Sequence, residues 1–149
     1  MYKKFLVPVD GSHTSRLAYE KAIELAKLTN AEIVLLQVSF DIDYYSRKGV
    51  LFARKYYNEG ETKSASAAII SEIRKDIDEG DLKITELILL GDPAQRIIGE
   101  ASKDGYDLIV MGSRGNGVLK GAVLGSVSQH VLNGGNRPVL IVKEHHEIS

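Results

Sequence analysis

Residues 106–127 have the sequence YDLIVMGSRGNGVLKGAVLGSV. The apolar run 108–111 is bounded by turn residues, which is typical of a strand buried on both faces of a parallel sheet. A loop with five glycines follows, and Ser126 opens an apolar-periodic segment at 127–132 that predicts a helix. Glycines let backbone N–H groups approach an anion, and a helix N-terminus carries unpaired donors and about half a positive charge. We therefore expect a phosphate site where the loop meets the helix.

The spacing of the glycines indicates which kind of phosphate-binding motif to expect. Gly112 and Gly115 are separated by two residues, and nine more lie between Gly115 and the pair Gly125-Ser126. The spacing resembles the nucleotide-binding signature of the universal stress protein family, in its ATP-binding branch. It matches neither the P-loop nor the G-x-G-x-x-G dinucleotide fingerprint. The alternative is a merely flexible loop, but loops of this length in compact domains are usually functional.

Length and composition limit the classes of function. A chain of 149 residues predicts a single domain, 1–149, large enough to bury a core. The formal net charge is -1, so we expect no nucleic-acid or membrane partner. The sequence contains no cysteine, which excludes disulfides and cysteine-ligated zinc. The first residues, MYKK, do not form a signal peptide, and we expect a cytoplasmic protein.

Strand and helix patterns alternate along the chain. Apolar runs predict strands at 4–9, 31–38, 83–90, 108–111 and 139–142. Helical periodicity predicts helices at 15–29, 61–80, 93–105 and 127–132. Five strands and four helices in alternation predict a doubly wound α/β fold, with a parallel sheet and helices on both faces.

Turn and capping residues predict where these helices begin and end. Ser12 or Ser15 can cap the first helix, while Asp92 followed by Pro93 predicts the start of the third and Gly105 its end. The apolar face predicted for the second helix consists of Ala65, Ala68, Ile69, Ile73 and Ile77, with Gly80 just past its end. The segment 40–60 has no clear period, and we assign it no structure.

The family resemblance runs almost from end to end and implies a Rossmann-like sheet of order 3-2-1-4-5. In that order the first and fourth strands end side by side, at the point where the strand order reverses. The resemblance implies that ATP lies there against Pro8, Val9 and Asp10 on the floor, Val38 beside adenine, Met111 and Gly112 beside base and ribose, and Arg114, Gly115, Gly125, Ser126 and Val127 around the phosphates. Backbone N–H groups from Gly125 through Val127 are the expected phosphate donors. Gly91 belongs to the matching end of the third strand.

Asp10 has two interpretations of about equal weight. A carboxylate beside phosphates repels them, so Asp10 could hold ribose hydroxyls or a Mg²⁺ ion shared with the phosphates. It could instead form an Asx-turn at the strand end. His13 is expected to be exposed, and we assign no metal to His145, His146 and Glu147 near the chain end.

The function implied by the resemblance is an ATP-binding regulatory or stress-response protein with slow or no hydrolysis. The rival is an ATP-hydrolysing or nucleotidyl-transferring enzyme, although the inferred crevice offers no nucleophile beside a base. A phosphoacceptor receiver domain is disfavoured, because only one acidic residue, Asp10, follows the first strand. We expect a homodimer through the last strand, because Val139, Leu140, Ile141 and Val142 form an apolar edge and similar family members pair there.

Overall fold

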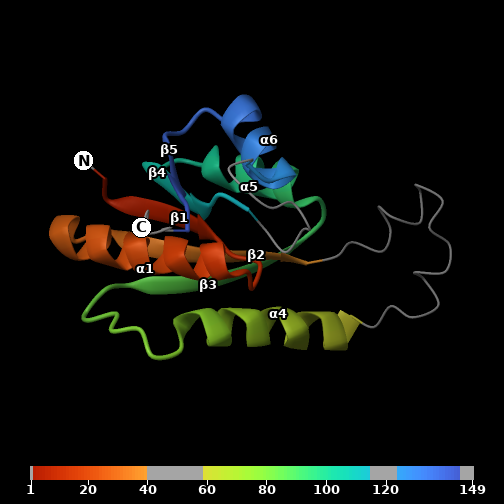
Figure 1. Cartoon of the computed structure of the whole chain (residues 1–149), viewed down its shortest axis with the longest axis horizontal. Helices are drawn as coiled ribbons and strands as arrows, with labels where there is room; N and C mark the ends of the chain where they lie inside the picture. The colour runs from red at the N-terminus through yellow and green to blue at the C-terminus, as the bar shows by residue number, and fades with distance from the viewer. Residues whose placement is uncertain (1, 40–58, 115–123, 145–149) are drawn as a thin grey trace, which may run out of the picture.

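The computed structural model describes residues 2–39, 59–114 and 124–144. The strands are β1 (Lys4–Pro8), β2 (Glu32–Ser39), β3 (Ile84–Leu90), β4 (Leu108–Gly112) and β5 (Val139–Val142). The helices are α1 (His13–Thr29), α4 (Glu59–Arg74), α5 (Pro93–Ala101) and α6 (Ser126–Gly134). Their alternation confirms the predicted fold class (Figure 1).

All five strands are parallel, in the order β3-β2-β1-β4-β5, as predicted. In the centre, Phe5 of β1 pairs with Ile33 of β2 on one side and with Leu108 of β4 on the other. The chain runs outward from β1 to β3 and then crosses to β4, so the strand order reverses between β1 and β4. Ligands of doubly wound sheets bind at the carboxyl edge of such a switch point.

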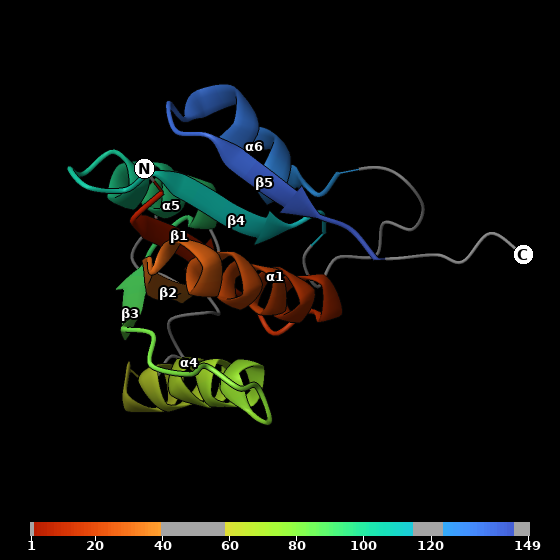
Figure 2. The same ribbon diagram turned by 90° about the vertical axis from the view of Figure 1, so that its left-hand side faces the viewer.

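Among the described elements, α1 and α4 cover one face of the sheet and α5 and α6 cover the other (Figures 1 and 2). Strand residues alternate between the two faces, and each set joins its own apolar cluster. On the side of α1 and α4, the cluster contains Phe5, Val7, Tyr19, Ile33, Leu35, Ile70 and Val110. On the side of α5 and α6, it contains Leu6, Val34, Leu36, Ile97, Ile109, Met111 and Val131. The four helices are held on the sheet by burial of these side chains.

Side chains cap α1 and α5 at the carboxyl edge. The Ser12 hydroxyl accepts from the Ser15 amide of α1 at 3.2 Å, and the Asp92 carboxylate accepts from the Gln95 amide of α5 at 3.0 Å. The predicted start of α5 is therefore confirmed. Its predicted end is wrong, because α5 stops at Ala101 and Gly105, with φ +97°, forms the later turn into β4.

The prediction for α4 is wrong at its end and in part on its inner face, although Ile73 is buried and Ile69 and Ile77 pack against the core as predicted. The helix ends at Arg74, before positive-φ residues Asp76 and Gly80 turn the chain toward β3. Its buried side chains include Ser66, Ile70 and Ile73, whereas the predicted inward residues Ala65 and Ala68 are exposed. Contact with β2 determines which side chains of α4 are buried. Alanine is small and only weakly apolar, so it can occupy the buried or the exposed face of a helix.

A hydrogen-bonded group of polar side chains ties α1 to the turn before β3. Arg74 donates from Nε and Nη2 to Glu79 at 2.8 and 2.6 Å, and the Tyr19 hydroxyl donates to the same carboxylate. The bonds from Arg74 lower the pKa of Glu79, overcoming the opposing effect of burial. Burial, and then the bond to Glu79, raises the pKa of Tyr19.

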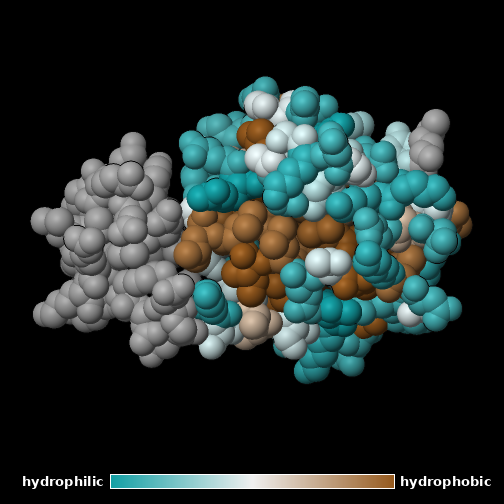
Figure 3. Space-filling model, turned by 180° about the vertical axis from the view of Figure 1, so that it is seen from behind, coloured by the Kyte–Doolittle hydropathy of each residue, from teal (hydrophilic) through white to brown (hydrophobic). Residues whose placement is uncertain are grey.

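The outer strand β3 is only partly covered. Helix α5 packs over β2, and the side chains Leu87 and Leu89 of β3 remain half-buried at the margin of the α5–α6 cluster. Figure 3 shows a band of apolar surface on the rear of the molecule. This rear side is on the left in Figure 2, where β3 lies.

Most of the unassigned segment 40–60, namely 40–58, lies outside the described residues, and α4 already includes 59–60. Within the part that the structure describes, no helix has the length and apolar character needed to cross a membrane.

Candidate nucleotide site

A cavity of about 270 Å³ lies at the carboxyl edge of the sheet, around the ends of β1 and β4. Its volume is close to the lower end of the ~300–1,000 Å³ range of small-molecule sites. Ten residues predicted for the site line it: Pro8, Val9, Asp10, Val38, Met111, Gly112, Arg114, Gly125, Ser126 and Val127. The eleventh, Gly115, lies outside the described residues. The fold thus brings together residues 119 positions apart in the chain, and their contacts with a ligand stay a prediction.

The side of the cavity toward β2 and α5 is apolar. Leu36 and Met111 are buried strand residues, Val38 is half-buried, and Ile97 of α5 closes over them. These four side chains also belong to the α5–α6 cluster, so the packed core holds them in place. An apolar wall of this kind suits the face of a flat heterocycle.

Asp10 forms the Asx-turn that was one of its two interpretations. Its Oδ1 accepts from the Ser12 amide at 2.9 Å, and this turn leads directly into the cap of α1. Asp10 also lines the cavity. Asp10 therefore combines the turn with a place in the cavity lining, and its role toward ribose or a metal ion stays a prediction.

Gly112 has a packing role that the sequence did not reveal. A Cβ at this position would lie 2.6 Å from the Thr14 hydroxyl and 2.7 Å from the Thr14 carbonyl carbon. The end of β4 can approach the first turn of α1 this closely only because residue 112 is glycine. Gly112 therefore shapes the cavity wall whether or not it contacts a ligand.

Helix α6 begins without a capping side chain, because its N-cap residue is Gly125. The Gly125 amide, expected to serve a phosphate, donates to the Ser113 carbonyl at 2.8 Å and so has an acceptor within the protein. The first-turn amides of 126–128 are the ones that can point toward a ligand. The Ser128 hydroxyl donates to the Gly112 carbonyl at 2.9 Å and fixes α6 to the end of β4.

Arg114 supplies the positive charge of the cavity lining. Its carbonyl oxygen accepts from the hydroxyls of Ser12, at 3.4 Å, and Thr14. Its guanidinium donates to Glu144, two residues beyond β5, at 3.2 Å. A held arginine next to the positive end of α6 is an arrangement that binds phosphate oxygens.

The described residues include no group of three or more histidine, aspartate or glutamate side chains that could hold a metal ion. Asp10 is the acidic residue of the cavity lining. The site thus fits a Mg²⁺ ion only where the ligand supplies most of the oxygen atoms, as nucleotide phosphates do.

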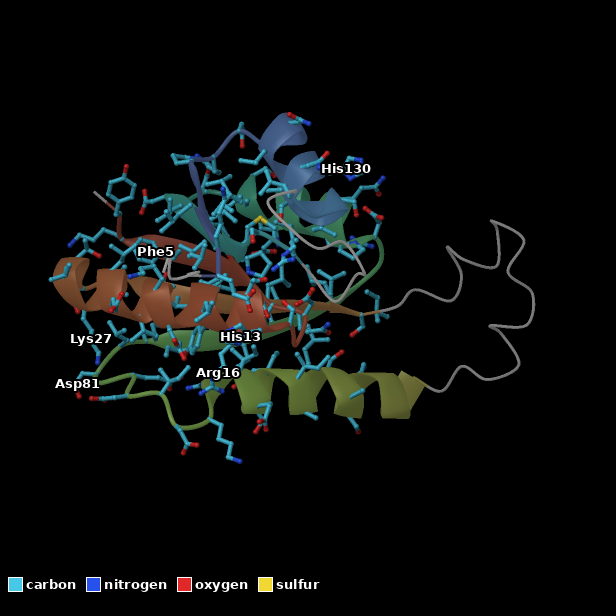
Figure 4. All side chains as sticks on the ribbon, in the orientation of Figure 1. Phe5, His13, Arg16, Lys27, Asp81 and His130 are labelled. Atoms are coloured by element: carbon cyan, nitrogen blue, oxygen red, sulfur yellow. The ribbon has the colours of Figure 1, made fainter. Side chains whose placement is uncertain are left out.

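The two histidines that the structure describes, His13 and His130, do not line the cavity. His13 is 63% exposed at the start of α1 and lies 3.6 Å from Glu144, while His130 is exposed on α6, as Figure 4 shows. Five lining residues were not predicted from the sequence: Ser15, Leu36, Pro93, Ile97 and Ser128. The signal for Pro93 was present, since Gly91-Asp92-Pro93 follows a strand that ends at the same edge. Gly91 itself does not line the cavity.

Comparison with known proteins gives the family and its fold. The universal stress protein MJ0577 of Methanocaldococcus jannaschii is 33% identical over 155 positions that cover 96% of each chain. YxiE of Bacillus subtilis is 33% identical over 96% of this chain and 100% of its own. The solved structure of MJ0577 matches with a TM-score of 0.78 at 32% identity and covers 99% of both chains.

A second solved structure bears on the ligand. It is a universal stress protein in complex with cAMP, which matches with a TM-score of 0.69 at 26% identity and covers 95% of this chain and 97% of its own. The sequence match to the family model extends over residues 1–143, from before β1 to just past β5. With this match, and with relatives 33% identical over nearly their whole length, the chain belongs to the universal stress protein family.

Proposed function

We propose that this protein is a cytoplasmic ATP-binding regulatory or stress-response protein, in which nucleotide binding is coupled to conformation or to choice of partner. The observation that carries the proposal is the juxtaposition, in one cavity, of an apolar wall, the uncapped start of α6 and Arg114. The apolar wall suits adenine, and the α6 amides with Arg114 suit the phosphates. The cAMP complex of a relative with the same fold supports an adenine nucleotide as the ligand class.

A Mg²⁺ ion belongs to this proposal as a companion of the phosphates. Asp10 is the cavity carboxylate that can reach such an ion, directly or through water. The ion would offset the repulsion between Asp10 and the phosphates. Its role is therefore to permit binding.

Rapid hydrolysis is not part of the proposal. Among the described lining residues, Asp10 is the single carboxylate and there is no histidine, cysteine or lysine. One of its oxygens already accepts the Ser12 amide, which makes it a poor general base. We expect turnover well below the enzyme median of about 10 per second.

The test has two steps. Native mass spectrometry of the purified protein should reveal a bound adenine nucleotide, and titration calorimetry should then show ATP binding tighter than cAMP or adenosine. Arg114→Gln should weaken ATP much more than adenosine, while the matched variant Arg16→Gln, on α1 outside the cavity, should leave both unchanged. Absence of binding by every adenine nucleotide at millimolar concentration would contradict the proposal.

We also propose a homodimer through β5. This strand lies at the edge of the sheet, its four apolar side chains are all half-buried, and among the described residues only β4 pairs with it. An apolar edge of this kind favours pairing with a second copy. Sedimentation velocity should show a dimer at micromolar concentration, and a monomer with and without ATP would contradict it.

A further inference from the structure

The carboxylate of Glu144 contacts the guanidinium of Arg114, the positively charged group of the cavity lining. Glu144 Oε2 accepts from Arg114 Nη2 at 3.2 Å, and Glu144 Oε1 lies 3.6 Å from His13 Nε2. The side chains of Arg114 and Glu144 are 21% and 34% exposed, so water screens the pair only in part. Three elements thus converge here: the end of β4, the start of α1 and the residues after β5.

Different parts of the protein contact the backbone and the side chain of Arg114. Ser12 and Thr14 hold its carbonyl oxygen, and Gly112 allows the close approach of α1 that brings them there. The guanidinium can therefore exchange partners without movement of the chain. Its planar fork binds carboxylate and phosphate oxygens in the same way, so the two kinds of anion compete for it.

We propose that Glu144 is the internal counter-anion of Arg114 and sets the selectivity of the site by phosphate charge. This inference rests on the proposed nucleotide binding. A phosphate that reaches Arg114 must displace the Glu144 carboxylate or lie beside it, and like charges side by side are unfavourable. The penalty increases with the negative charge of the ligand, so Glu144 weakens binding of ATP more than that of ADP, and it leaves adenosine unaffected.

The test compares Glu144→Gln with wild type by titration calorimetry of ATP, ADP, AMP and adenosine. The substitution keeps the shape of the side chain and removes its charge. We expect ATP to bind at least about fivefold more tightly, ADP to gain less, and adenosine to change by less than about twofold. Glu24→Gln is the matched control, because Glu24 is an exposed α1 residue eleven positions beyond His13, roughly 16 Å along the helix.

Each outcome decides the inference. An ATP-to-adenosine affinity ratio that is the same in Glu144→Gln and wild type overturns it, while leaving the proposed function intact. Weaker ATP binding in the variant also overturns it, because Glu144 would then assist the ligand. Failure of both proteins to bind any of the four ligands overturns the proposed function and this inference together.

Discussion

Helices α1 and α6 begin at the same edge of the sheet, yet their first turns are built differently. At α1, the Ser12 hydroxyl accepts the Ser15 amide, and Asp10 accepts the Ser12 amide through an Asx-turn. At α6, the cap position is Gly125, which has no side chain. The protein itself satisfies donors at the start of α1, whereas the first residues of α6, Ser126 to Ser128, line a cavity that Arg114 also lines.

The difference shows how helix starts at the same edge of the sheet can have different roles, one in stability and the other in ligand binding. A helix start left without a cap costs stability, because its amides lose the acceptor that Ser, Thr, Asp or Asn would supply. An anionic ligand can replace that acceptor and benefits from the helix dipole. Helix α5, capped by Asp92, resembles α1 in this respect. The comparison therefore predicts that changes at α6 alter ligand binding, while changes at α1 alter stability.

The largest effect is expected from giving α6 the cap that α1 has. Gly125→Asp places a carboxylate on the first-turn amides, where it fills the phosphate position and repels the ligand. We expect ATP binding to weaken more than 100-fold, which corresponds to about 2.7 kcal/mol. The apo protein should remain folded and gain a few tenths of a kcal/mol, because φ -65° and ψ 161° suit any residue.

Titration calorimetry and thermal unfolding with ATP measure this effect. Wild type at 100 times the dissociation constant should gain about 2.7 kcal/mol of stability, and Gly125→Asp should gain none. Gly125→Val should also abolish binding, by steric exclusion. The control is Gly99→Val on α5, where an added Cβ would have no atom within 4 Å. If Gly125→Asp still gains stability from ATP, the phosphates do not lie at α6.

A smaller loss of binding is expected from Ser126→Ala, at the first residue of α6. The variant keeps every backbone amide and removes one hydroxyl that can bond a phosphate. A bond to a charged group contributes about 1.5–3 kcal/mol, so ATP affinity should fall by roughly 10- to 150-fold. Because Ser126 is exposed, unfolding without ligand should change little. Equal affinities of variant and wild type in calorimetry would show that the hydroxyl makes no ligand contact.

Local patterns predicted the strands, the helices and their alternation, whereas the order of the strands and most cavity residues were implied by the resemblance to the universal stress protein family. Buried strands appear as apolar runs, and parallel strands bring their carboxyl ends to one edge. The same patterns mislead where tertiary contacts decide. The buried face of α4 could not be predicted in full, because Ala65 and Ala68 tolerate either a buried or an exposed position. The position of Ile70 against the sheet, where it is fully buried, then determines which face is inward.

Three features of the site depend on contacts between distant residues, so no local pattern indicates them. The glycine at 112 makes room for Thr14, although it belongs to a motif that resembles a nucleotide signature. The amide of Gly125 donates to the Ser113 carbonyl, so the proposed phosphate donors are the amides of the residues after it. Ile97 joins the cavity from the middle of α5, where its helical periodicity predicts only a core position.

A loss of stability without any effect on ligand binding is expected from Glu79→Gln, between α4 and β3, where Glu79 bonds to Tyr19 of α1. The Gln side chain cannot accept two bonds from Arg74 as a carboxylate does, so we expect a loss of about 1–2 kcal/mol at pH 7. The folded pKa of Glu79 lies below its ordinary value of 4.5. Its stabilisation is therefore complete above that pH and is lost as the pH falls through the folded pKa.

Urea unfolding from pH 7 down to pH 3 tests this prediction. The difference between wild type and Glu79→Gln should narrow as the pH falls below 4.5, because the wild-type carboxyl becomes neutral first in the unfolded chain and then, at lower pH, in the folded protein. ATP affinity at pH 7 should be equal in both proteins. A difference that stays constant with pH would mean that the charge of Glu79 contributes nothing.

The smallest effect is expected from Ser12→Ala, which makes the start of α1 resemble that of α6. The Ser15 amide loses its acceptor, and the Arg114 carbonyl loses its weaker hydrogen bond at 3.4 Å. Loss of an N-cap hydroxyl costs about 1 kcal/mol, so the free energy of unfolding should fall by about that amount, while ATP affinity changes by less than about twofold. Ser12→Thr restores a capping hydroxyl and should recover the stability. If Ser12→Ala instead unfolds like wild type and binds ATP tenfold more weakly, the start of α1 takes part in binding, and the division of roles between the two helices is wrong.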